Sequence, residues 1–206
     1  MSTDPALATP PELVTGGPLI AMHDAIVARL REVFPTNKFT HGFVDSRLTP
    51  VEWGDLMRLK PFVGLGWGGA RPSDANGRRM SATAEWTVFL ATGNSAGPTQ
   101  RYAGDTQGPG LLAMVQVAAG ALQGMVVRPP RAREPVGTVE VSGISNLVID
   151  GFQEKNTAIA GIDLRIPFTL EWIAGADEFL RAGAAWVISA DETAGPNDDI
   201  DIREAP

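Results

Sequence analysis

The sequence predicts an α+β fold, in which a mainly antiparallel sheet of four to five strands carries two helices on one face. Strand patterns and helix patterns follow one another without the regular strand–helix alternation that builds parallel sheets. The prediction depends on an alternation of apolar and polar residues, a second long strand pattern and two helical patterns, which fall at 162–173, 80–92, 19–34 and 110–123.

The alternation at 162–173 is the most regular pattern in the chain. Six large apolar residues occupy every second position from Ile162 to Trp172. Because successive side chains of a strand point to opposite faces, all six fall on one face, where burial contributes about 1.5–3 kcal/mol for each. This strand is therefore expected to form a main wall of the core. Pro167 lies on the polar face and lacks a backbone N–H, which predicts an edge position or a break in the ladder.

Two helices are expected to cover the apolar face of the sheet. Apolar residues recur at helical spacing over 19–34, where Pro18 suits the first helical position and Pro35 ends the pattern. The second helix, 110–123, is apolar on nearly all sides and is followed by Gly124. A helix of that composition is expected to be buried.

The other strands are predicted from shorter patterns. A weaker strand covers 38–44, and a short buried strand covers 61–67 and runs into a glycine-rich loop. The pattern at 80–92 is fairly apolar on both faces, which places it in the centre of the sheet. A strand at 139–149 is expected to pair antiparallel with 162–173.

Connections and weaker elements complete the prediction. The stretch 93–108 is predicted to be a polar loop, and 127–137, rich in arginine and proline, a protruding connection. Short helices are predicted at 50–59 and 176–182, and a short strand at 186–188.

The domain organisation follows from the two ends of the chain. Residues 1–17 are rich in proline and glycine, which predicts a flexible N-terminal arm. Residues 18–173 form the α+β domain. Residues 174–206 form a C-terminal extension, whose part from Ser189 onward carries six carboxylates and one arginine and is expected to be solvated.

Composition excludes several classes of function. A formal net charge of −7 and a pI near 4.8 argue against a nucleic-acid-binding surface, which needs a basic patch. The absence of cysteine excludes disulfides, thiol catalysis and thiolate metal sites. The N-terminus lacks the pattern of a signal peptide, and no apolar run is long enough to cross a membrane.

The stretch Gly64-Leu65-Gly66-Trp67-Gly68-Gly69 has the glycine spacing of a dinucleotide-binding motif. That motif requires a helix immediately after the glycines, so that the helix N-terminus meets the pyrophosphate. Here Arg71, Pro72, a turn and a strand follow instead. A bulged or sharply bent strand end explains the glycines more simply.

No other catalytic or metal-binding pattern is complete. His23 lies beside Asp24 on the first helix, where neighbours are not expected to face each other, and His41 lies in a poorly patterned stretch. Asn197, Asp199 and Asp201 have the spacing of a calcium loop, but the next position is isoleucine where glycine is required. The sequence therefore predicts no cofactor, no metal and no catalytic residue.

Two groups of residues are candidates for contacts with other proteins. Arg128, Arg131 and Arg133 are expected either to bind an acidic partner or to form an ordinary solvated loop. Trp186, Val187 and Ile188 are expected to add a short strand to the sheet of a neighbouring subunit, because backbone pairing provides affinity without special side chains.

The helix at 20–30, Pro61-Phe62-Val63-Gly64-Leu65, the strand at 87–94 and the segment at 110–115 follow one another in a characteristic order. This order, with its apolar spacing, resembles the small tail proteins of Mu-like phages and prophages, which are similar to phage tail terminators. The resemblance covers residues 19–172, and the extension after Ile173 goes beyond the usual end of the pattern.

The resemblance implies a structural virion protein without enzyme activity. Such a protein forms a ring, usually a hexamer, that caps the tail tube and accepts the head-side connector protein at the head-proximal end of the virion tail. Genome DNA passes through the ring without specific binding, and a negative lining would limit its adhesion. Alternatives are another virion part of the same fold, such as a tail-tube or head-completion protein, and a nucleotide-binding enzyme that uses the 64–69 glycine stretch.

Overall fold

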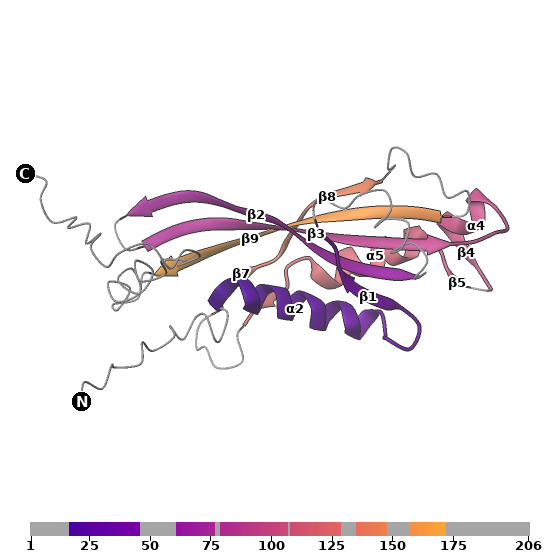
Figure 1. The fold of residues 1–206 in the computed structure, drawn as a ribbon, viewed down its shortest axis with the longest axis horizontal. Helices are drawn as coiled ribbons and strands as arrows, with labels where there is room; N and C mark the ends of the chain where they lie inside the picture. Colours follow the sequence, from indigo (N-terminus) through magenta and orange to yellow (C-terminus); the bar gives the residue numbers. More distant parts are fainter. Residues whose placement is uncertain are drawn as a thin grey trace, which may run out of the picture. The chain divides into compact units, whose positions relative to one another are not determined.

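Five strands form one mixed sheet in the computed structural model of the chain (Figure 1). The structure describes residues 17–45, 61–76, 79–106, 108–128, 135–147 and 157–171, all of which lie within one compact unit. The main elements are α2 (Gly17–Val33), β1 (Thr40–Phe43), β2 (Phe62–Asn76), β3 (Arg79–Gly93), α5 (Leu111–Leu122), β8 (Glu140–Asn146) and β9 (Thr157–Glu171).

The strand order across the sheet is β1-β2-β3-β9-β8. β1 runs parallel to β2, and every other neighbouring pair is antiparallel. β3 lies between β2 and β9, which confirms the central position predicted for 80–92. The α+β fold with a mainly antiparallel sheet is also confirmed.

β9 contains the alternation seen in the sequence. Ile162, Leu164, Ile166 and Phe168 are buried on one face, as predicted. The ladder between β8 and β9 ends at Arg165, so among the described strands of the sheet only β3 lies beside β9 around Pro167. The proline therefore occupies the kind of edge position that its missing N–H requires.

Helices α2 and α5 pack against the same face of the sheet (Figure 1), as predicted. Arg29 of α2 also donates a hydrogen bond from Nε to the carbonyl oxygen of Ala121 in α5, at 3.2 Å. The side chains that fill this core from the two helices are Met22, Ile26, Leu30, Leu111, Met114, Ala118 and Leu122. They meet alternate residues of β3 and β9, together with Val63 and Leu65 of β2.

The prediction that this helix is buried holds for one side of α5 only. Only Leu111, Met114, Ala118 and Leu122 are buried, whereas other positions of the same helix face solvent. A helix that is apolar on every side carries no pattern that shows which side the sheet will cover. Its composition therefore could not indicate that only one side is buried.

The stretch 93–108 is more ordered than a polar loop. It contains the short helix α4 (Pro98–Ala103) and the strands β4 (Gly104–Asp105) and β5 (Gly108–Pro109), which pair with each other. Gly104 has φ +83°, a conformation that favours glycine, and a Cβ at Gly110 would overlap the backbone of Gly104. These two glycines allow the tight return of the chain into α5.

The predicted protrusion at 127–137 is closed at its base. β6 (Val126–Val127) and β7 (Gly137–Thr138) pair antiparallel, so both ends of the connection are held together. Gly124, with φ +75°, ends α5 and turns the chain into β6.

Several predictions fall outside the described residues. They are the short helices at 50–59 and 176–182, the strand at 186–188, most of the N-terminal arm and the whole C-terminal extension.

Candidate interaction surface

The glycine-rich stretch is part of a strand, so the predicted loop at this position was wrong. β2 continues through Gly64–Gly69 to Asn76 and pairs with β3 along its length. The register shifts between Trp67 and Gly69, which confirms the expected bulge. No helix begins after these glycines, so the geometry that a dinucleotide site needs is not formed here.

Close packing explains two of these glycines. A Cβ on Gly64 would lie 2.5 Å from Cγ2 of Val44 and 2.7 Å from the ring of Phe62. A Cβ on Gly66 would lie 2.7 Å from the carbonyl oxygen of Val44 and 2.9 Å from the ring of Phe89. The chain after β1 and a small apolar cluster occupy that space. This cluster lies on the face of the sheet opposite α2 and α5, called the second face below, and its buried members are Val44, Phe62, Ala91 and Ile159.

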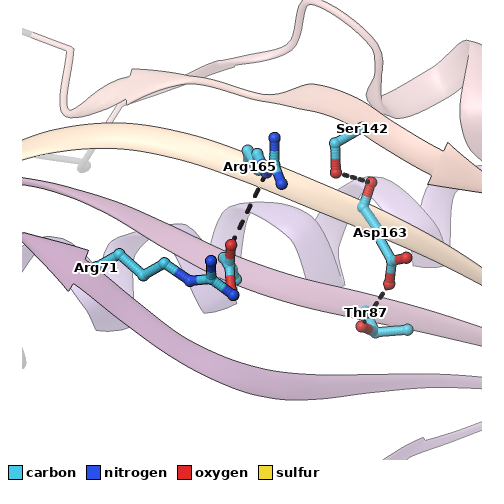
Figure 2. A network of polar contacts seen from close by, with 6 residues as sticks. Arg71, Thr87, Ser142, Asp163 and Arg165 are labelled. Carbon is cyan, nitrogen blue, oxygen red and sulfur yellow. Dashed lines mark hydrogen bonds and ion pairs between the residues drawn. The ribbon is translucent and has the colours of Figure 1, made fainter. Parts of the chain in front are cut away.

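Figure 2 shows a polar network on the second face. Thr87 donates from Oγ1 to Oδ1 of Asp163 at 2.9 Å, and the Ser142 hydroxyl donates to the carbonyl oxygen of Asp163 at 3.2 Å. The Glu85 carboxylate lies 3.2 Å from Arg71 and 3.8 Å from Arg165. The network joins β2, β3, β9 and β8, but its arginines are largely exposed, and such ion pairs contribute only about 0–1 kcal/mol each.

The two histidines have separate partners. Nδ1 of His23 lies 2.9 Å from Oδ1 of Asp24, so the expectation that these neighbours do not meet was wrong. Nε2 of His41 lies 2.7 Å from the carbonyl oxygen of Phe34. Both histidines line one hollow between α2 and β1, but each is bonded to a different partner.

The two edges of the sheet are formed by different strands. At the first edge, β1 has a strand neighbour on one side only among the described strands, and at the second edge the same holds for β8. Thr40 and Val44 donate their N–H groups toward β2, so by the alternation along a strand the N–H groups of His41 and Phe43 point outward. The N–H of Leu147 donates to the carbonyl oxygen of Ile159 in β9. Because Ile144 is three residues away, an odd number, its backbone N–H and C=O groups point to the opposite side, away from β9. Among the described residues, both edges therefore present backbone groups that are available for pairing.

Exposed apolar side chains accompany each edge. At the first edge, Phe43 is 58% exposed and Trp67 is 38% exposed. At the second edge, Ile144 of β8 is 54% exposed and Leu112 of α5 is 61% exposed. Oε1 of Gln123, at the end of α5, accepts a hydrogen bond from the N–H of Val141 in β8. Leu112 lies three helical turns before Gln123 and therefore on the same side of α5, the side beside β8.

An aromatic row connects the first edge to the core. The rings of Phe43 and His23 lie 6.2 Å apart, those of His23 and Trp86 6.1 Å, and those of Trp86 and Trp67 5.5 Å in a stacked arrangement. A hollow of about 140 Å³ lies beside this row, between α2 and β1, and its lining includes Val27, Leu30 and Phe43.

Most of the contact residues predicted from the sequence lie outside the described residues. Arg128 is exposed immediately after β6, whereas Arg131, Arg133 and Trp186 to Ile188 are not described. The prediction of a contact at these positions therefore stays a prediction. Sequence reasoning missed both sheet edges, and the one signal for the second edge was the lack of any charged residue in α5.

Within the described ranges, no group of three or more histidine, cysteine, aspartate or glutamate residues is placed to hold a metal ion. The predicted calcium-like spacing from Asn197 to Asp201 lies outside those ranges. None of the helices described is long and apolar enough to span a membrane.

No protein-family model and no curated protein matches the chain.

The packing around Gly66 leads to a test of the structure. Gly66→Ala is expected to lower the free energy of unfolding by about 1–3 kcal/mol, because the new methyl group would overlap a backbone carbonyl and a ring. Gly68→Ala is the matched control, since a Cβ there meets nothing closer than 3.4 Å. Urea denaturation of both variants measures the difference. Equal stability of the two variants would contradict the role assigned to Gly66.

Proposed function

We propose that this chain is a structural subunit that assembles head-to-tail into a ring at the end of a phage tail tube, as a tail terminator does. The observation that carries the proposal is that the sheet ends in two unlike edges, each with outward backbone groups and exposed apolar side chains. The order and type of the elements also agree with the fold expected from the resemblance to small tail proteins of Mu-like phages.

Unlike edges are what a closed ring requires. A two-fold dimer uses the same patch twice, whereas a ring joins two different patches on every subunit. A subunit with one β1 edge and one β8 edge has two such patches. Extended backbone at both edges allows strand addition, which needs no special side chains for affinity.

The proposed ring has defined partners in the virion. It would cap the tube built by the tail-tube protein and receive the head–tail connector protein, and it would act by shape without enzyme activity. A tail-tube or head-completion protein of the same fold would use the same two edges. Binding to the end of the natural tube distinguishes a tail terminator from these two alternatives.

The direct test is to mix the chain with tubes assembled from the tail-tube protein of the same genome. Electron microscopy is expected to show a ring at one end of each tube, because heterologous contacts form a ring where their rotation closes, and the resemblance implies about six copies. Native mass spectrometry gives the number of copies. Tubes that stay uncapped and keep growing would contradict the proposal.

The C-terminal extension is expected to contribute to assembly through Trp186, Val187 and Ile188. Ending the chain at Gly175 removes this segment and is expected to reduce the ring population, because strand addition to a neighbour is lost. A chain that ends at Ala190 keeps the segment, removes the acidic tail and serves as the control. Unchanged assembly of the shorter chain in native mass spectrometry would exclude this contact.

The acidic balance of the chain, −7 in total, predicts a ring that does not retain DNA. Double-stranded DNA incubated with purified rings at physiological salt is expected to elute separately in size-exclusion chromatography. Co-elution of the DNA with the rings would contradict a repulsive channel, whether or not it weakens as salt is raised.

A further inference from the structure

The two edges of the sheet fit each other in a specific way. We infer that β8 of one copy pairs antiparallel with β1 of the next copy, and that Phe43 then packs against Ile144 and Leu112 across the contact. This inference rests on the proposed function in that it needs copies of the chain to associate, and it adds which surfaces meet.

Strand direction supports the pairing. β1 is parallel to β2, β2 is antiparallel to β3, β3 is antiparallel to β9, and β9 is antiparallel to β8. β8 therefore runs opposite to β1. When a second copy continues the sheet in the same orientation, its β1 meets β8 as an antiparallel neighbour, which is the slightly more stable of the two ladder types.

The apolar side chains at the two edges lie on the same face of the sheet. Phe43 is in register with Leu65, and Ile144 is in register with Ile162; both partners are buried beneath the helices. Side chains on one face of neighbouring strands contact each other. A sheet continued from copy to copy would therefore bring Phe43 and Ile144 together, with Leu112 of α5 on the same side.

The first edge also has a hollow that a side chain from the second edge can fill. The hollow between α2 and β1 has a volume of about 140 Å³, about that of one large apolar side chain, and Phe43 forms part of its wall. Apolar residues Val27, Leu30 and Val63 line it as well. Ile144 and Leu112, both more than half exposed at the second edge, are the side chains that this hollow would receive.

The charged residues at the two edges do not oppose this pairing. Arg31 borders the hollow and Lys38 precedes β1, whereas Glu140 is the charged residue of β8 and α5 has none. Asp45, which follows β1, already makes a contact within its own chain. β8 and α5 carry no basic residue, so Arg31 and Lys38 meet no like charge from these elements in this pairing.

Cysteine cross-linking tests the inference without a background signal, because the chain contains no cysteine. Phe43→Cys and Ile144→Cys are made as separate full-length proteins, and each alone and an equal mixture are treated with a short bis-maleimide. The mixture is expected to give a cross-linked dimer that neither protein gives alone, because the contact joins unlike patches. Asp163→Cys, on the second face, replaces Ile144→Cys in the control mixture and is expected to give none.

Substitution of an exposed residue provides a second readout. Leu112→Lys is expected to weaken self-association by about tenfold or more, since it places a charge at the centre of the contact. Ala113→Lys adds the same charge one residue further along α5, on its solvent side, and is expected to leave association unchanged. Both positions are exposed, so folding, checked by circular dichroism, is expected to be retained.

The outcomes separate this inference from the proposed function. Cross-linking of either single variant as strongly as the mixture, or equal effects of Leu112→Lys and Ala113→Lys, would overturn the pairing of β8 with β1. Rings that form from both cysteine variants without any cross-link would also overturn it, while the ring itself would stand. A chain that caps no tube and stays monomeric would contradict both the proposed function and the pairing of β8 with β1.

Discussion

The ladder between β3 and β9 is the interaction on which the rest of the structure depends. Each strand has fifteen residues, and they stay in register from Arg79–Glu171 to Gly93–Thr157. Because the register is continuous, alternate residues of both strands fall on one face without interruption, and that face is wide enough for α2 and α5 together. The helices, the two edges and the second face all take their positions from this pair of strands.

The same register explains why the second face differs from the first. Residues out of phase with the core form two zones there, an apolar cluster near Phe62 and Ala91 and the polar network around Glu85 and Asp163. Gly64 and Gly66 belong to the apolar zone, where the chain after β1 approaches the sheet too closely for a side chain. A glycine spacing that formally matches a nucleotide motif is thus a consequence of sheet packing.

The period-two pattern of β9, the central position of β3 and the helix of α2 could be predicted from the sequence because each has a periodicity of its own. The path of β2 could not, since glycines that mark a loop in one context permit close packing in another. The exposed side of α5 could not be predicted either, because a helix without polar residues on any side carries no signal for its orientation. The candidate surface was missed for a related reason: a sheet edge is defined by which strands pair, and Phe43 and Ile144 look like ordinary core residues until the pairing is known.

The irregularities of β2 have a consequence for the tendency of the chain to aggregate. Beyond Leu65, the outer side of β2 has no neighbour among the described strands, and a long straight edge of this kind would recruit further chains without limit. The register breaks at Trp67/Gly69 and Pro72/Asp74, and Pro72 offers no N–H group, so this stretch is a poor template for fibre growth. Strand pairing with another chain would thereby be confined to short segments of this edge.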